Sequence, residues 1–400
     1  MSKNPTVKKW LKQPGFEALA IGLLITTLQL TIALRIAPAL QLKESYSLLC
    51  QWDCRWYEGI ARDGYHSTIP PTAQNPALSN VAFFPAYPYF ARVLHLGLHT
   101  NPRLTLLFIA QLFAVVFWAA LWRVIKDWKI SRALGALVVL GILSHPAAFM
   151  LVMGYSESLF LACMLLFLRK SSSPGGTGKF HAAGAGFLMS ATRIVGVVVA
   201  LYPLMSSSLK RNTRRLQAGI IAGAAVGGAA VFLLYCKIRF GQFDLYMQTQ
   251  KIGWGIVPDY TALFDRNSLH YRFRLDQLTL SYSLIAFLLF TILESTLWIF
   301  SKSVGLSKRL PIYVTALSIF YISISGLKSV GFQSLIRYSL PWHLLLVLCL
   351  GHLLSRPPFT RISPNLLKSA ALLLASGLIA LWVRLQLPYM SDFLHGRWFA

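Results

Sequence analysis

The strongest constraint on this chain is a series of apolar runs, each about as long as a membrane is thick. A helix of roughly 20 residues spans the hydrocarbon core of a bilayer, and runs of this kind recur between residues 16 and 385. Only 13% of the residues are charged, and the mean hydropathy is +0.56. An ordinary soluble domain has about 25% charged residues. The pattern therefore predicts an all-α polytopic membrane protein and excludes an ordinary soluble domain.

Clusters of Lys and Arg between the runs indicate the orientation, because cytoplasmic flanks of membrane helices are enriched in these residues. The first cluster precedes the run 16–36, which is too long for a removable signal peptide and lacks a small-residue cleavage site. We therefore expect a cytoplasmic N-terminus and an outer C-terminus, with the net charge of +25 serving mainly orientation and phospholipid contact rather than nucleic-acid binding. About eleven spans are expected, at residues 16–36, 104–122, 133–152, 155–168, two within 181–208, 217–236, 277–300, 310–326, 337–354 and 367–385.

The segment 181–208 is too short for two full spans, although basic clusters bracket it on both sides. We expect a pair of short or broken helices with an apex near Thr192 and Arg193. Irregular backbone at membrane depth is tolerated only where it is buried in protein or lines a wet cavity. Arg193 is therefore expected to point into a cavity.

Residues 1–400 are interpreted as one transmembrane domain with two long outer segments, 38–102 and 237–276. Long loops in compact proteins are usually functional. The first contains a short helix in which Trp52, Trp56 and Ile60 share one side, and this helix is expected to lie in the interface with its aromatic rings at headgroup level. Asp53 and Tyr57 occupy the adjacent stripe, four residues apart.

Six collinear segments resemble those of the PIG-V-like mannosyltransferases, which are multispanning GT-C glycosyltransferases. The first combines WDCRWYEGIARDGY with the following AFFPAYPYFARVL. The others are HPAAFMLVMGYSESLFL, SATRIVGVVVAL, RFGQFDLYMQTQKIGWG, IRYSLPWHLLL and the C-terminal HGRWFA. No single segment is specific, but six in order across the whole chain are.

The resemblance implies a GT-C-type bundle, and the short loops and modest length of the chain favour a bacterial plasma membrane over the endoplasmic reticulum. The resemblance also implies a hexose, above all mannose, carried on a polyprenyl phosphate, and an acceptor glycan or lipid at the outer leaflet. Transfer would invert the configuration at the sugar carbon, with Asp53 as the base in the first outer loop. Within the matched segments, the supporting or substrate-binding candidates are Trp52, Tyr57, Glu58, Tyr65, Tyr155, Glu157 and Tyr338.

A single carboxylate suffices for this chemistry, because a leaving phosphate needs no protonation and only the acceptor hydroxyl must lose a proton. Asp53 suits that role; the alternative is that it merely caps or solvates an interfacial helix. Glu58 and Asp63 are rival bases, or they form ordinary surface ion pairs with Arg62 or Arg55.

The leaving phosphate requires cations, and the planar fork of Arg is suited to it. Arg193 and Arg337 are the best candidates, because each lies where an apolar segment meets the outer surface. The alternative is that either one extends to lipid headgroups. Lys251 and Arg239 in the second outer segment are weaker candidates for the same role.

Three further residues have structural interpretations. Glu157 at a helix start favours the helix dipole, or it contacts the acceptor or Arg193. His145 precedes a proline and is expected to end its helix. Glu294 lies inside a span, where a carboxylate is costly unless paired, and a structural role is expected for it.

Neither a metal ion nor another cofactor is expected. His95 and His99 have ligand spacing but no third ligand nearby, so they are interpreted as interface residues. Cys50 and Cys54 are not expected to form a disulfide unless the loop is irregular there, because a helix holds positions i and i+4 badly for that geometry.

Two other functions compete with glycosyl transfer. A transporter or flippase of a lipid-linked substrate would place polar residues near the bilayer midplane and show internal repeats, and neither is visible in the sequence. A scaffold of a glycan-assembly complex stays open as well.

Overall fold

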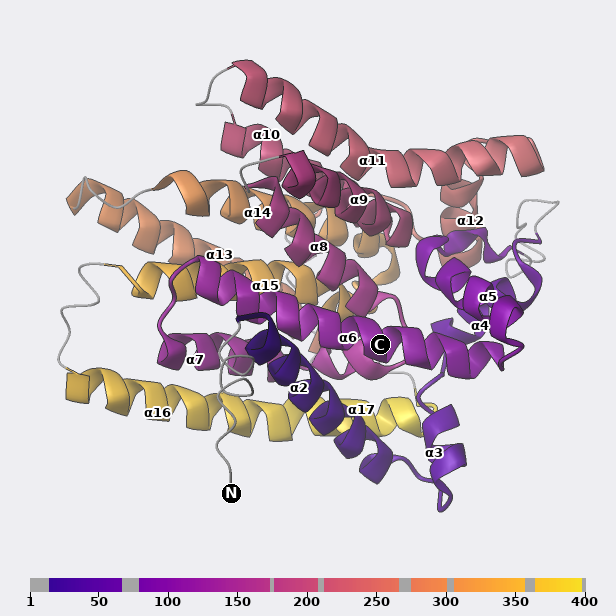
Figure 1. The fold of residues 1–400 in the computed structure, drawn as a ribbon, viewed down its shortest axis with the longest axis horizontal. Coiled ribbons are helices and arrows are strands. Elements are labelled where there is room, and N and C mark those ends of the chain that lie inside the picture. Colours follow the sequence, from indigo (N-terminus) through magenta and orange to yellow (C-terminus); the bar gives the residue numbers. More distant parts are fainter. Residues whose placement is uncertain are drawn as a thin grey trace, which may run out of the picture.

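The computed structural model describes residues 14–66, 79–172, 176–207, 212–265, 275–300, 306–356 and 364–397, and within these ranges all regular secondary structure is helical (Figure 1). Seven of the described helices are long and apolar enough to cross a membrane. They begin at Gly15, Pro102, Arg215, Leu275, Arg309, Leu335 and Ser369. The chain is therefore an integral, multi-pass membrane protein.

Apart from the second half of 133–152, the expected spans fall on helical segments. These are α2 (Pro14–Ile36), α6 (Pro102–Asp127), α7 (Arg132–Leu143), α8 (Glu157–Ser171), α9 (Gly176–Thr192), α10 (Leu201–Ser207), α11 (Asn212–Phe240), α13 (Leu275–Phe300), α14 (Leu306–Leu327), α15 (Leu335–Leu354) and α16 (Pro364–Leu381). A last short helix, α17 (Leu387–Leu394), continues from α16 through a single π-helical turn, η7 (Trp382–Gln386).

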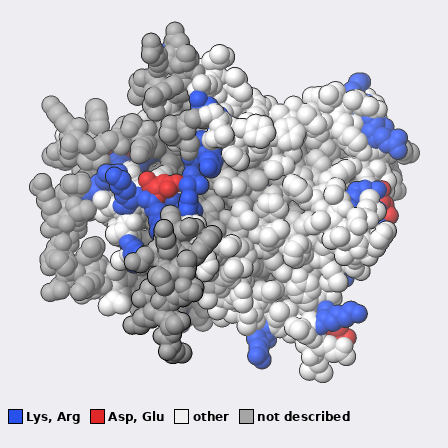
Figure 2. Space-filling view, in the orientation of Figure 1, with Lys and Arg blue, Asp and Glu red and all other residues white. Residues whose placement is uncertain are grey.

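The short helices outside the spans gather at one end of the bundle. They are α3 (Leu42–Ser47), α4 (Asp53–Asp63), α5 (Ala86–Leu98) and α12 (Leu245–Trp254), all at the right in Figure 1. Figure 2 shows that charged residues on this face lie mostly toward its two ends, with a broad uncharged region between them. Such a band suits the hydrocarbon of a bilayer.

The centre of the bundle is tightly packed around α8, whose apolar residues are almost completely buried. α9 and α11 approach each other closely where Gly228 meets α9, because a Cβ at this position would lie 2.0 Å from the carbonyl oxygen of Phe187. Small residues allow such close packing of membrane helices. This contact holds the end of α9 in place.

The expected break in 181–208 is present. α9 ends at Thr192, Arg193 has extended backbone with φ −152°, and a 3₁₀ helix, η3 (Ile194–Ala200), follows before α10. The prediction of an interrupted pair with its apex at these residues is confirmed.

The expectation of one helix over 133–152 is wrong. α7 ends at Leu143, and a buried 3₁₀ segment, η2 (Ala148–Val152), replaces its second half. The backbone polar groups are satisfied from within the protein: Gln29 donates to the carbonyl of Ala148, and Gln386 donates to that of His145. Irregular backbone in a membrane protein requires such internal partners.

Cys50 and Cys54 form a disulfide with a Cα–Cα distance of 5.1 Å, which the sequence allowed only for an irregular loop at this point. α4 begins only at Asp53, so Cys50 lies in the preceding loop, where Trp52 has a positive φ of 52°. The helical i, i+4 geometry that argued against a bridge therefore does not apply. The bridge packs closely on Gly154, where a Cβ would lie 2.3 Å from Sγ of Cys54.

Candidate functional site

A cavity of about 960 Å³ opens at the end of the bundle where α4 and α12 lie. Its walls come from segments far apart in the sequence, and together they contribute both charged and aromatic side chains. The lining residues are Gln51–Tyr57 except Cys54, Ala82–Phe84, Thr192–Val195, Tyr246, Gln250, Trp254, Ile256, Leu327, Val330, Gln333, Ser334, Arg337, Tyr338 and Gly396.

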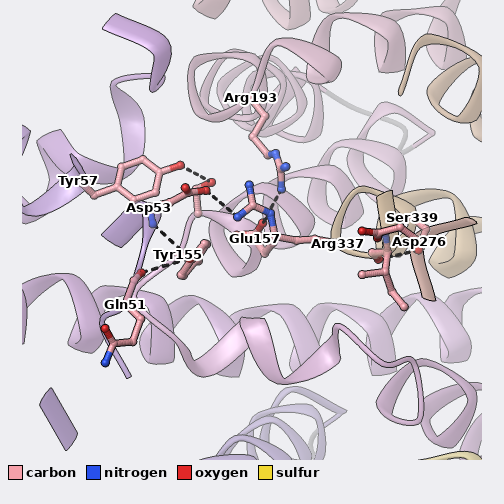
Figure 3. Close-up of polar contacts among 11 residues, drawn as sticks. Gln51, Asp53, Tyr57, Tyr155, Glu157, Arg193, Asp276, Arg337 and Ser339 are labelled. Atoms are coloured by element: carbon pink, nitrogen blue, oxygen red, sulfur yellow. Dashed lines mark hydrogen bonds and ion pairs between the residues drawn. The ribbon is translucent and has the colours of Figure 1, made fainter. Parts of the chain in front are cut away.

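Four charged side chains meet at one wall of this cavity and form a continuous network (Figure 3). Nη1 of Arg337 lies 2.6 Å from Oδ2 of Asp53, and its Nε lies 3.1 Å from Oε1 of Glu157. Nη1 of Arg193 donates to the same Oε1 at 2.8 Å. We call Asp53, Glu157, Arg193 and Arg337 the charged network. Its two positive and two negative charges balance.

The members of the charged network differ in access to the cavity. The side chain of Glu157 is 3% exposed and does not line the cavity, whereas that of Asp53 is 21% exposed and does. Among the described residues, none donates a hydrogen bond to Oδ1 of Asp53, and Oε2 of Glu157 is also without a donor. Glu157 therefore anchors both arginines from behind, while Asp53 presents a carboxylate oxygen to the cavity.

The backbone around Asp53 is fixed by contacts with the segment that precedes α8. The hydroxyl of Tyr155 donates to the carbonyl of Gln51 at 3.2 Å and accepts from the backbone N–H of Asp53 at 3.3 Å. The backbone N–H of Gly154 donates to the carbonyl of Leu49. Together with the Cys50–Cys54 bridge, these contacts hold the first turn of α4 against the segment that precedes α8.

Arg337 lies in the first turn of α15, and a carboxylate from another helix caps that turn. Asp276 in α13 accepts from the backbone N–H groups of Ser334 and Ile336 at 2.9 and 2.8 Å. This is the role of a helix N-cap performed in trans. Sequence reasoning missed the role of Asp276, since the spacing of 60 residues between donor and acceptor leaves no local signal.

The guanidinium groups of both arginines lie close to the same aromatic ring. The Tyr338 ring lies 4.6 Å from Cζ of Arg193 and 5.4 Å from Cζ of Arg337, and the Tyr155 ring lies 5.1 Å from the latter. Such contacts stabilise a cation. The rings therefore help to hold two like charges near each other and oriented toward one cavity.

Tyr57 lines the cavity beside the charged network and donates to Oγ of Ser156 at 3.1 Å. Burial raises the pKa of its phenol strongly, and the carboxylates of Glu157 and Asp53 raise that pKa further. Tyr57 therefore stays protonated and acts as a neutral hydrogen-bonding group.

Not all of the predicted site residues reach the cavity. Trp52 and Tyr338 line it, and Tyr155 and Glu157 lie directly behind its wall. Tyr65, Glu58 and Lys251 do not line it. The hydroxyl of Tyr65 donates to the carbonyl of Phe83, so this side chain supports a wall from outside.

The two rival bases are occupied elsewhere. Glu58 pairs with Arg103 at 2.8 Å, contrary to the expected partners Arg55 and Arg62, whereas Asp63 pairs with Arg62 at 2.9 Å as expected. Within the described part of the chain, no group of three His, Cys, Asp or Glu side chains is arranged to hold a metal ion.

Trp52 is 37% exposed, but the expectation that this face of α4 lies in the interface with its aromatic rings at headgroup level is wrong for the rest of the face. Ile60 is fully buried, and Trp56 stacks on Phe83 with ring centroids 5.8 Å apart. Trp254 of α12 packs against both rings at 5.7 Å. Phe83 and Trp254 cover this face, and both come from later segments of the chain. The sequence of α4 alone therefore could not predict that the face is buried.

The comparison with solved structures finds the same fold in a crystal structure of ArnT from Cupriavidus metallidurans bound to undecaprenyl phosphate. The match has a TM-score of 0.50 at 13% sequence identity, and it covers 94% of this chain and 74% of that chain. The expected all-α, polytopic membrane bundle is thereby confirmed at the level of the fold. No protein-family model and no curated protein matches the sequence.

Proposed function

We propose that this protein is a glycosyltransferase that moves a hexose, specifically mannose, from a polyprenyl-phosphate carrier to an acceptor hydroxyl at the outer face of the membrane. The observation that carries the proposal is the charged network: a cavity-facing carboxylate oxygen beside two buried arginines. The PIG-V-like segments of the sequence and the fold shared with a protein crystallised with undecaprenyl phosphate support it.

The proposed reaction needs three functions from this wall. Asp53 accepts the proton of the acceptor hydroxyl while the oxygen of that hydroxyl attacks C1 of the hexose. The bond between C1 and the phosphate oxygen breaks on the opposite side, so the configuration inverts. The polyprenyl phosphate leaves with the bonding electrons, and Arg337 and Arg193 hold its negative charge.

The Cys50–Cys54 bridge supports the outer location of this site. Disulfides persist in oxidising compartments and are rare in the cytosol. This bridge lies within three residues of Asp53, so the first outer segment and the cavity are proposed to face the outside. The orientation agrees with the basic clusters at the opposite ends of the helices.

The test is transfer of radiolabelled mannose from polyprenyl-phosphate mannose to membrane acceptors by the purified protein. Asp53→Asn is expected to lower the rate by about 10²–10⁴-fold, the usual contribution of general-base catalysis. Asp63→Asn is the matched control, because Asp63 lies on the same helix but outside the cavity, and it is expected to retain full activity. Equal rates for wild type and Asp53→Asn would refute the assignment of the base.

Transport is the competing function, and the same preparation tests it. A wild-type protein that transfers no sugar from any polyprenyl-phosphate donor, yet moves such a donor between the leaflets of a vesicle, would replace the proposal with a flippase. The charged network lies at the cavity that opens at the end of the bundle where the short helices α4 and α12 lie, whereas transporter sites lie near the midplane.

A further inference from the structure

Three aromatic rings form a second wall of the cavity that the charged network does not use. Trp56 stacks on Phe83 with an angle of 19° between the ring planes, and Trp254 packs edge-on against both. All three line the cavity, and the two tryptophans are only half-buried. We call them the aromatic wall. Because its rings support one another, it is preformed.

The position of the aromatic wall relative to Asp53 follows from helix geometry. Trp56 lies three residues after Asp53 in α4, so their side chains are neighbours on the helix surface, with Cβ atoms about 5–6 Å apart. Arg337 contacts Asp53 directly, and Arg193 reaches it only through Glu157 and Arg337. Along these contacts, the order is Arg193, Arg337, Asp53 and then the aromatic wall.

This order has a stereochemical consequence for the reaction proposed above. In an inverting transfer, the attacking oxygen and the leaving oxygen stand on opposite faces of the sugar carbon. The arginines mark the side of the leaving phosphate, and Asp53 receives the proton of the attacking hydroxyl. The acceptor hydroxyl must then lie within reach of Asp53, and the aromatic wall is the part of the cavity beside Asp53 that the arginines do not occupy.

The chemistry of this wall favours a sugar over a hydrocarbon chain. The amides of Gln250 and Gln333 border the cavity together with the rings, and Gln250 is held by donating to the carbonyl of Ala82 at 3.1 Å. A pyranose has an apolar face that packs on an aromatic ring and hydroxyls that bond amides and carboxylates. Trp254 ends α12, one of the short helices that gather at one end of the bundle (Figure 1).

We propose that Trp56, Phe83 and Trp254 form the acceptor subsite, and that the group bound there is the pyranose ring whose hydroxyl Asp53 deprotonates. The inference rests on the proposed function for the identity of the reaction. The inference goes beyond the proposed function in two ways. It assigns the acceptor to one wall of the cavity, and it identifies the acceptor as a saccharide rather than a protein hydroxyl or an unsubstituted lipid alcohol.

The experiment measures ligand binding as well as turnover, so that the two proposals fail separately. The donor site is filled with undecaprenyl-phosphate mannose in the Asp53→Asn protein, reconstituted in nanodiscs. Saturation-transfer NMR then measures binding of methyl α-D-mannopyranoside to the remaining part of the cavity. The same measurement is made with Trp254→Ala or Trp254→Phe added. The control is Phe264→Ala, which removes an exposed aromatic ring of the same outer segment that does not line the cavity.

We expect the mannoside to bind with donor present, and Trp254→Ala to weaken this binding by about 10-fold, the loss of roughly 1.4 kcal/mol that one well-placed ring contributes. Trp254→Phe retains most of the affinity, and Phe264→Ala retains all of it. Undecaprenyl phosphate alone binds wild type and Trp254→Ala equally. In the otherwise wild-type enzyme, Trp254→Ala raises the acceptor KM about 10-fold and leaves the donor KM unchanged.

Two results overturn the inference. One is no mannoside binding to the donor-filled protein. The other is a Trp254→Ala protein that loses affinity for undecaprenyl phosphate and keeps it for the mannoside, because the rings would then hold the prenyl chain. Trp254-dependent mannoside binding in a protein that transfers no sugar would instead leave the subsite standing and refute the proposed function.

Discussion

Two buried arginine–carboxylate clusters lie in different parts of this protein, and they differ in what surrounds them. Arg309 in α14 pairs with Glu294 in α13 through two hydrogen bonds, one to each carboxylate oxygen. In the charged network, by contrast, Asp53 and Glu157 each keep one oxygen without a donor among the described residues. In the first cluster both carboxylate oxygens accept a hydrogen bond. In the second, two carboxylate oxygens can still accept one from a bound ligand.

The cavities beside the two clusters differ in the same sense. The cavity at Glu294 and Arg309 has about 250 Å³, and its other lining residues are neutral. The one at the charged network has about 960 Å³ and includes the aromatic wall. A charge buried in a membrane protein is a functional candidate by default, but the expected structural role of Glu294 agrees with its closed pairing. A binding site is thus distinguished from a structural ion pair by carboxylate oxygens that lack a hydrogen-bond donor and lie beside a large cavity.

The sharpest test of this distinction removes both partners of each cluster. Replacing a buried ion pair by apolar groups of similar volume is often neutral for stability, so Glu294→Leu/Arg309→Met is expected to keep mannose transfer within a few-fold. Asp53→Asn/Arg337→Gln is expected to lower transfer by at least about 10²–10⁴-fold, since it removes the proposed base. The measurement is the mannose-transfer rate of each double variant. Equal losses in both variants would show that the charged network is no more functional than the Arg309–Glu294 pair.

Removing single carboxylates tests the anchoring role that burial assigns to Glu157. Glu157→Gln leaves the buried Arg193 without a carboxylate, and Glu294→Gln does the same to Arg309. Each change costs about 3–5 kcal/mol of stability. The loss should appear in both variants as a lower thermal midpoint in detergent. Only Glu157→Gln is expected also to weaken binding of undecaprenyl phosphate, because it frees the arginines to reorient. Wild-type affinity in that variant would argue against anchoring.

The disulfide lies beside the charged network and not beside the Arg309–Glu294 pair. Loss of the disulfide is therefore expected to affect the charged network alone. Closing a five-residue loop stabilises the folded state by about 2 kcal/mol in the chain-entropy description. Cys50→Ser/Cys54→Ser is expected to lower thermal stability by that order and to slow transfer, because Asp53 lies within the closed loop. Cys163→Ser, which changes a free buried thiol, is the control. An unchanged transfer rate in the double serine variant would show that the bridge does not position Asp53.

The smallest expected effect is a loss of folding stability at alkaline pH that depends on Tyr57. Its folded-state pKa is raised by burial, so its stabilising contribution is fully present below the unfolded value of about 10 and is lost as the pH rises above it. Wild type should lose up to about 1.4 kcal/mol per pH unit more than Tyr57→Phe in this range. Thermal midpoints from pH 8 to 11 measure the difference. Parallel slopes would contradict the buried, protonated phenol.

Much of the fold was predictable because it depends on local composition. Apolar runs place the spans, and the short length of 181–208 placed the break at Arg193. The failures have a common cause. The buried 3₁₀ turn after α7 and the Cys50–Cys54 bridge depend on partners elsewhere in the chain, such as Gln29, Gln386 and Gly154.

The site divides in the same way. Asp53, Arg193 and Arg337 could be selected singly, since each is a charged residue beside an apolar segment. Glu58, Tyr65 and Lys251 looked similar in sequence, yet they face other partners or the surface. Neighbouring residues of one short helix point in different directions, and a motif alone does not say which direction meets the rest of the site.

The sequence by itself determined that this chain spans a membrane repeatedly, because the hydrophobic effect acts on each 20-residue run independently of the others. Only the tertiary structure decided that Asp53 meets Arg337, 284 residues away, and that Trp56 meets Trp254. Those meetings depend on how helices pack side by side. Packing is a property of complementary surfaces that no single segment carries alone.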